Sequence, residues 1–160
     1  MNPYVLSVIV ENEPGILSRV AGLFSRRGYN IKSLSVGETE DPKISRMTIV
    51  VTGDRQIVEQ IKKQLQKLID VVKIYELEPE ASVYRELALV KVMVNEQNRP
   101  SILEVVEIFR GKVIDIATES LTVELTGDHD KINAFVDMMK VYGISEMART
   151  GLTGLARFNG

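Results

Sequence analysis

Cysteine is absent from this 160-residue chain, and histidine occurs only once. Without cysteine there is no disulfide framework, no thiolate metal ligand and no thiol nucleophile. The formal net charge is only −2, and acidic and basic residues are interspersed, so no strong field would gather nucleic acid or an anionic membrane. Small neutral ligands and other proteins are the partners that this composition favours.

A long hydrophobic run is also missing from the N-terminus. The apolar stretch at residues 5–10 stops at the polar residues 11–14, and no cationic segment precedes it. Because a secretory signal needs both a cationic segment and a longer apolar run, we interpret the stretch as a β-strand. The protein is therefore expected in the cytoplasm.

The residue types that form active sites do not occur in useful combinations. His129 stands beside Asp128 and Asp130 at an expected helix start, and we interpret it as a solvated residue of the first turn. A metal site would need further His or Cys ligands at suitable spacing. The sequences Gly-x-Ser-x-Gly, Gly-x-Gly-x-x-Gly and Gly-Lys-Ser/Thr are all absent. We predict no catalytic residue and no metal-binding residue.

The chain contains an internal repeat. The sequence Thr-Gly-Asp at residues 52–54 recurs at residues 126–128, an offset of 74. Val10 matches Val94 at an offset of 84, so the second copy is ten residues shorter in its middle (84 − 74). Each copy should therefore have the same fold.

The first copy has the pattern of a β-α-β-β-α-β unit. Strands are predicted at residues 4–10, 29–37, 45–52 and 71–77. A helix is predicted from Pro14 to the residue before Gly28, because apolar residues recur there at helical spacing. Asp54 is the expected N-cap of a second helix. This order is the ferredoxin-like arrangement, a four-stranded antiparallel sheet with both helices on one face.

The second copy repeats that order. Its elements are predicted at residues 85–94, 100–109, 113–116, 121–126, 128–140 and 144–148. The fold class is therefore α+β, with two ferredoxin-like βαββαβ domains at residues 1–77 and 84–150. The polar, proline-bearing residues 78–83 are interpreted as a linker, and the glycine-rich residues 151–160 as a loose tail.

The segment at residues 11–18, here called the first loop, passes from the first strand into the first helix. Backbone N–H groups at a helix N-terminus attract an anion, and Gly15 lacks the side chain that would hold a ligand away. Asn12 supplies an amide, while Ile16 and Leu17 supply apolar surface. A free aliphatic amino acid needs these groups, but a plain helix cap above core residues needs them too. The segment alone does not choose between the two.

The strand that begins near Asn30 and Ile31 is expected at an edge of the first sheet. Unpaired backbone groups of an edge strand invite a second chain. If two copies pair there, Asn30 of one copy approaches Asn12 of the other. A ligand pocket would then lie at the dimer interface.

Several segments carry a resemblance to known families. The first copy resembles the ACT-domain family, ferredoxin-like modules that bind amino acids and regulate metabolic enzymes. More specifically, the chain is similar to the small-subunit family of acetolactate synthase (acetohydroxyacid synthase). The segments that carry this similarity are residues 6–8, 11–15, 17–20, 23–31, 45–49, 108–115 and 148–151, spread over nearly the whole chain.

The resemblance implies a non-catalytic regulatory chain in the biosynthesis of valine and isoleucine. Such a chain activates a separate large, catalytic subunit and confers feedback inhibition, usually by valine. The resemblance places thiamine diphosphate, Mg and FAD on that partner, and no cofactor in this chain. It also implies a homodimer through the ACT domains, with a valine site formed by Asn12, Gly15, Ile16, Leu17, Asn30 and Ile31. Asn30 would come from the partner chain.

The family pattern is not matched everywhere. Pro14 stands where some members carry a small polar residue, and we expect it to stiffen the first loop. The corresponding segment of the second copy, residues 95–101 or the second loop, has no glycine, so we predict no ligand there. In the family, this C-terminal half is associated with subunit contacts.

Three other functions fit the sequence less well. An RNA-binding module of the same fold needs aromatic residues on its inner strands, and these strands are aliphatic. A stand-alone, amino-acid-sensing regulator of transcription would need a DNA-reading helix or a basic stripe. A ferredoxin-like enzyme would need a nucleophile with its base, or a metal cluster. The regulatory subunit is the preferred interpretation.

Overall fold

A computed structural model describes residues 2–158 of the chain. By its internal contacts the chain divides into two compact units. The first unit comprises the residues up to Val83 together with those from Gly151 onwards, and the second comprises Tyr84–Thr150. Each unit contains a β-α-β-β-α-β succession and an antiparallel sheet, which confirms the predicted α+β class with two ferredoxin-like domains.

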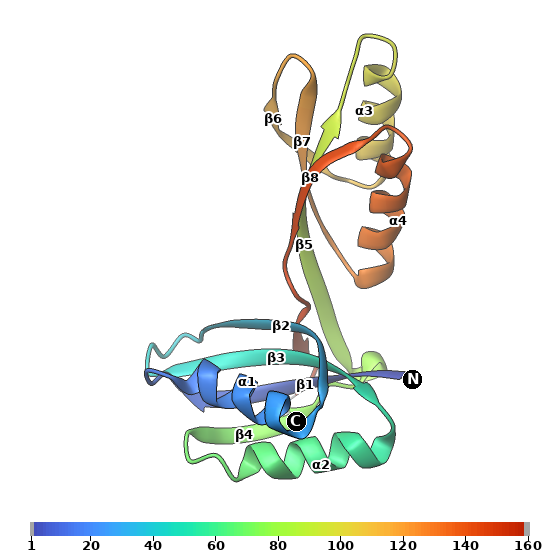
Figure 1. The fold of residues 1–160 in the computed structure, drawn as a ribbon. Helices are drawn as coiled ribbons and strands as arrows, with labels where there is room; N and C mark the ends of the chain where they lie inside the picture. Colours follow the sequence, from blue (N-terminus) through green and yellow to red (C-terminus); the bar gives the residue numbers. More distant parts are fainter. Residues whose placement is uncertain (1, 159–160) are drawn as a thin grey trace. The chain divides into compact units, whose positions relative to one another are not determined.

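The first unit has the predicted elements in the predicted order. They are β1 (Asn2–Glu11), α1 (Ile16–Arg27), β2 (Asn30–Glu38), β3 (Ile44–Gly53), α2 (Arg55–Gln66) and β4 (Val71–Glu76). The strand order is β2-β3-β1-β4, so β2 lies at an edge of the sheet, as expected. Both helices lie on one face of this sheet (Figure 1).

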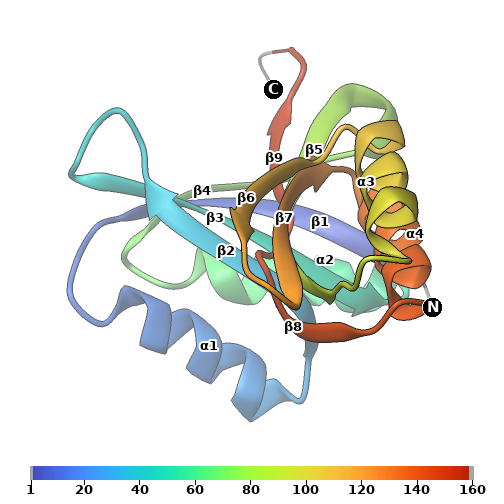
Figure 2. The ribbon, with the colours of Figure 1, turned by 90° about the horizontal axis from the view of Figure 1, so that it is seen from above.

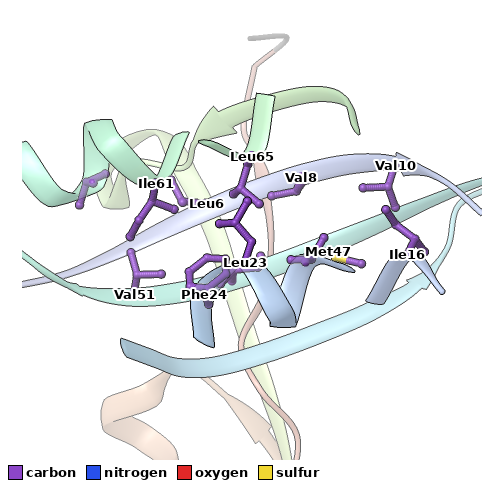
Figure 3. Packing of buried hydrophobic residues seen from close by; sticks show 13 residues of the cluster. Leu6, Val8, Val10, Ile16, Leu23, Phe24, Met47, Val51, Ile61 and Leu65 are labelled. Atoms are coloured by element: carbon purple, nitrogen blue, oxygen red, sulfur yellow. The ribbon is translucent and has the colours of Figure 1, made fainter. Parts of the chain in front are cut away.

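The core of the first unit lies between the sheet and these helices (Figure 3). Alternate residues of the central strands point into it because successive side chains of a strand face opposite sides. The strands contribute Leu6, Val8, Val10, Met47, Ile49 and Val51, and the helices contribute Val20, Leu23, Phe24, Val58, Ile61 and Leu65. Burying a side chain of this size contributes about 1.5–3 kcal/mol. This core fixes the ends of β1 and α1, between which the first loop runs.

The second unit repeats the arrangement with its own core. Its elements are β5 (Ser82–Met93), α3 (Arg99–Ile108), β6 (Lys112–Ile116), β7 (Ser120–Gly127), α4 (His129–Lys140) and β8 (Ile144–Arg149). The strand order is β6-β7-β5-β8, and α3 and α4 run side by side over one face (Figure 2). The buried residues between them include Val90, Ile102, Val123, Phe135 and Met139.

The segment expected to be a loose tail is ordered instead. Thr153–Ala156 form β9, which pairs with β5. Ser35 Oγ donates a hydrogen bond to the carbonyl oxygen of Leu152 at 2.9 Å, and the Leu152 side chain is buried. Gly151 packs so closely that an added Cβ would lie 2.9 Å from the carbonyl oxygen of Leu34. Glycine at this position therefore serves close backbone packing, not flexibility.

Residues 78–83 are likewise more than a linker. Pro79–Ala81 form the 3-10 helix η1, and β5 starts at Ser82, which is buried. The carbonyl oxygen of Ala81 accepts a hydrogen bond from Arg157 N–H at 2.8 Å. Both segments join the first unit because each satisfies backbone groups of the other.

The helix starts follow the expected chemistry with one exception. Asp54 Oδ1 accepts from Ile57 N–H at 2.9 Å, and Asp128 Oδ1 accepts from Lys131 N–H at 2.9 Å, so both are N-caps. Helix α1 begins at Ile16 and not at the expected Pro14. The intervening Gly15 has φ +84°, a left-handed conformation that ends any helical run there.

Candidate functional site

The first loop is shaped by backbone hydrogen bonds on both sides. Asn12 N–H donates to the carbonyl oxygen of Lys43 at 2.8 Å, in the turn between β2 and β3. Glu13 N–H donates to the carbonyl oxygen of Glu11 at 2.9 Å. The left-handed Gly15 then directs the chain into α1, and its carbonyl oxygen accepts from Arg19 N–H at 3.0 Å.

The start of α1 leaves backbone donors unpaired. Ile16 N–H reaches the carbonyl oxygen of Glu13 at 3.3 Å. Within residues 2–158, the N–H groups of Gly15, Leu17 and Ser18 meet no acceptor, and Gly15 supplies no side-chain cap. Unpaired N–H groups at a helix N-terminus carry partial positive charge and bind anions. The start of α1 therefore has unpaired donors of the kind that the expected anion site requires.

The Asn12 side chain is oriented by the neighbouring turn. Its Nδ2 donates to the carbonyl oxygen of Pro42 at 3.0 Å, and the side chain is exposed. Among the described residues, no donor reaches its Oδ1. Since the amide nitrogen is held, the oxygen is left to accept a hydrogen bond from an ammonium group.

The two apolar residues expected to line the site have different positions. Ile16 is only 6% exposed and packs in the core beside Val10 (Figure 3), so its side chain does not form a ligand wall. Leu17 is 43% exposed and lies on the surface. The difference follows from helical periodicity, because one of two consecutive residues on a surface helix faces away from the core.

Asn30 and Ile31 open β2 at the sheet edge. Asn30 is exposed, and its Nδ2 donates to Thr52 Oγ1 at 3.0 Å, again with no donor to its Oδ1 among the described residues. Ile31 is partly buried against the core cluster. Asn30 therefore resembles Asn12, because the amide nitrogen of each is held and the amide oxygen of each is left to accept a hydrogen bond.

One chain does not bring these two asparagines together. Asn30 is in register with Thr52 on β3, and Thr52 is in register with Pro3 on β1. Asn12 follows Pro3 by nine positions, so the two amides lie about 30 Å apart at ~3.3 Å per strand residue. A site that uses both must take Asn30 from a second copy, as the sequence analysis expected.

Two residues beside the first loop, Arg19 and Asp70, were not predicted from the sequence. The Arg19 guanidinium forms an ion pair with the Asp70 carboxylate, and Asp70 also accepts Glu11 N–H at its backbone carbonyl oxygen, at 2.9 Å. Arg19 Nη1 lies 3.3 Å from the point where a Cβ at Gly15 would stand. The spacing of four residues from Gly15 was the available signal, because residues i and i+4 share a helix face.

The second loop pairs most of its own backbone donors. Asn95 Oδ1 accepts from the N–H groups of Gln97 at 2.9 Å and Asn98 at 2.8 Å, and Asn98 Oδ1 accepts from Asn95 N–H at 2.7 Å. A hollow of about 880 Å³ lies beside this loop, with Arg99 and Glu119 among its lining residues. Three backbone donors of the loop are thus paired with asparagine side chains, and a fourth, Arg99 N–H, donates to the carbonyl oxygen of Asn95 at 3.0 Å.

His129 lies exposed in the first turn of α4, as expected, but its ring also has a partner that the sequence did not indicate. Its Nδ1 lies 2.9 Å from Oε2 of Glu86, a carboxylate that is only 6% exposed. Arg149 Nε donates to Oε1 of the same carboxylate at 2.8 Å. A buried carboxylate needs such partners, since an unpaired buried charge is strongly destabilising. The histidine therefore belongs to a structural polar cluster around Glu86.

Within residues 2–158, no group of three or more His, Cys, Asp or Glu side chains is arranged to hold a metal ion. No helix in this part of the chain has the length and apolar character needed to cross a membrane.

Both halves of the chain match family models. Residues 6–73 match the AHAS small subunit-like ACT domain, and residues 85–158 match the small subunit of acetolactate synthase. The two matches together leave only residues 2–5 and 74–84 of the described chain uncovered.

Relatives of similar length and a solved structure agree with these matches. The probable acetolactate synthase small subunit of Methanothermobacter thermautotrophicus is 52% identical over 96% of this chain and 92% of its own length. The acetolactate synthase small subunit of Mycolicibacterium smegmatis is 52% identical over 96% of this chain and 91% of its own. The crystal structure of the acetolactate synthase small subunit from Thermotoga maritima superposes with a TM-score of 0.93, at 42% identity, over 100% of both chains.

Proposed function

Because this chain belongs to the acetolactate synthase small-subunit family, we propose that it binds valine and controls a separate catalytic subunit. It raises the activity of that thiamine-diphosphate-dependent partner, and valine reverses the increase. In this proposal, the catalytic partner binds thiamine diphosphate, Mg and FAD, and this chain binds no cofactor. The complex acts in the cytoplasm, in the biosynthesis of branched-chain amino acids.

The valine proposal rests on the first loop, which combines hydrogen-bond donors for a carboxylate with an acceptor for an ammonium group. The unpaired N–H groups of Gly15, Leu17 and Ser18 suit a carboxylate. The unpaired Oδ1 of Asn12 suits an ammonium group. The exposed Leu17 side chain offers apolar surface for an aliphatic side chain. A zwitterionic, aliphatic amino acid combines all three features.

The site is completed by a second copy that pairs along β2. β2 is an edge strand, so its outer backbone groups are available for another strand. A two-fold axis beside β2 sets two such strands antiparallel. Asn30 of the partner then lies at the end of the sheet that carries Asn12, and its unpaired Oδ1 adds a second acceptor for the ammonium group.

Valine acts by shifting the dimer between two arrangements. A ligand shifts such an equilibrium only through its different affinity for the two states, and a coupling of about 1–3 kcal/mol is typical. Valine bound between two chains favours the arrangement in which Asn12 and Asn30 are close. That arrangement is the one that does not activate the catalytic subunit.

The test is the formation of acetolactate from pyruvate by the cognate catalytic chain. The rate is measured for the catalytic chain alone, with this protein added, and with this protein and valine. Stimulation that valine reverses is the expected result. Stimulation without a response to valine would contradict the ligand site, and no stimulation would favour a stand-alone sensor instead.

A further inference from the structure

Arg19 occupies an unusual electrostatic position. It lies in the first turn of α1, where the partial positive charge of the helix terminus disfavours a cation. Asp70 compensates this cost through the ion pair with Arg19, and the Asp70 side chain is mostly buried. The arrangement thus keeps a cation beside the unpaired N–H groups of the first loop.

The Asp70 ion pair uses only part of the guanidinium. An arginine side chain carries five N–H donors in a planar fork. Nη2 is the nitrogen that contacts Asp70, and within residues 2–158 Nη1 has no acceptor. Nη1 lies on the Gly15 side, 3.3 Å from the position of an added Cβ, and the Arg19 side chain is 46% exposed. The unused donors therefore reach the region where an anion would bind.

We propose that Arg19 binds the carboxylate of the amino acid, together with the backbone N–H groups at the start of α1. The inference rests on the proposed valine site and adds to it the residue that selects a charged carboxylate. Backbone N–H groups attract any acceptor oxygen, whereas a guanidinium strongly favours one that carries a full negative charge. Asp70 holds Arg19 in place, and Gly15 leaves room for the guanidinium.

Calorimetric titration of the full-length protein with two ligands tests this role. Valine carries the carboxylate, while valine methyl ester keeps the ammonium group and side chain but lacks the negative charge. For Arg19→Gln we expect the affinity for valine to fall about tenfold or more, since a hydrogen bond between charged groups is lost. The affinity for the ester should change little, so the preference for valine over the ester falls by the same factor. Arg19→Lys should restore part of the preference.

A matched control removes the same positive charge from a residue of the second unit. Lys91 also forms an exposed ion pair, with Glu146 at 2.8 Å, and Lys91→Gln should leave both affinities unchanged. Thermal unfolding of each variant reports whether it is folded. If Arg19→Gln binds valine as the wild type does, or weakens valine and the ester equally, the role proposed for Arg19 is overturned. A wild-type protein that binds no valine would contradict the proposed function itself.

Discussion

The first loop and the second loop have the same place in the fold, since each follows the first strand of its unit. They differ in how their backbone N–H groups are paired. In the first loop, N–H groups of Gly15, Leu17 and Ser18 remain unpaired. In the second loop, the side chains of Asn95 and Asn98 accept three of the N–H groups. One repeat therefore leaves donors open at the start of its first helix, and the other pairs donors in the same place with its own side chains.

The open faces of the two sheets differ in a similar way. Ser7 of the first unit corresponds to Lys91 of the second, at the offset of 84 that relates the two strands. Ser7 is buried and its Oγ accepts from Arg46 Nη1 at 2.6 Å, while Arg46 also donates to Tyr75 Oη at 2.7 Å. Lys91 instead forms an exposed ion pair. On this face, the first unit therefore has buried polar groups, and the second unit has charged groups that contact solvent.

The largest expected effect comes from a charge placed in the first loop. Gly15→Asp puts a carboxylate where the ligand carboxylate should lie, and valine affinity should fall about 100-fold or more through repulsion and lost access. In the acetolactate assay, inhibition by valine should disappear while stimulation of the catalytic partner persists.

Gly15→Asn is the matched control for that variant. Asparagine has nearly the same shape as aspartate and tolerates the left-handed conformation required at φ +84°, but it has no charge. It should retain more valine affinity than Gly15→Asp. A Gly15→Asp variant that stays sensitive to valine would contradict the assignment of the first loop.

Close packing of the C-terminal segment gives the next largest effect. In Gly151→Ala the added Cβ meets the Leu34 backbone at 2.9 Å, which should lower the free energy of unfolding by about 1–3 kcal/mol. Gly37→Ala is the control, because a Cβ at Gly37 has nothing within 4 Å. Urea unfolding measures both variants, and equal stabilities would show that the segment is not held against β2.

Asparagine-to-alanine variants of the two loops should have opposite consequences. Asn95→Ala removes the acceptor of two N–H groups and should lower the free energy of unfolding by about 1 kcal/mol without changing valine affinity. Asn12→Ala should lower valine affinity with a smaller loss of stability, because its side chain makes one exposed hydrogen bond. Unfolding and titration of both variants test the comparison, and it fails if the two variants behave alike.

The smallest expected effect concerns pH and the exposed face of the second unit. The hydrogen bond and charge of Lys91 hold the pKa of Glu146 below its ordinary value of 4.5. A carboxylate whose pKa is lowered by folding contributes stability above its unfolded pKa and loses it as pH falls through the folded value. Glu146→Gln should therefore be slightly less stable than the wild type at neutral pH, and equally stable once Glu146 is protonated. Urea unfolding across this pH range checks the trend, which a constant difference would contradict.

Local patterns were sufficient to predict the elements of the fold. Apolar residues at helical or strand spacing located the helices and strands of both repeats, although not η1 or β9, and Asp54 was recognised as an N-cap from its position alone. Gly151 was predicted to lie in a loose tail because the sequence does not show which residue a glycine packs against. Its partner is Leu34, which is 117 positions earlier in the chain (151 − 34).

The candidate site was predictable only in its main-chain features. Gly15 and the helix start indicated an anion site, but the orientation of Asn12 depends on Pro42, thirty positions away. Arg19 gained its role from Asp70, which local sequence patterns do not connect to it. Likewise, the partner of His129 is Glu86 on another element. Side-chain pairs of this kind arise from the tertiary fold and have no local signature.

A mixture of two variants tests the central claim, a valine site shared between two chains, most directly. Asn12→Ala and Asn30→Ala chains with different affinity tags are exchanged, and the heterodimer is purified and titrated with valine. In the heterodimer, one site combines the intact Asn12 of one chain with the intact Asn30 of the other, while the second site lacks both. The account predicts wild-type affinity at half the wild-type number of sites, although each variant homodimer binds weakly. A heterodimer that binds as weakly as the two homodimers would contradict a site shared between chains.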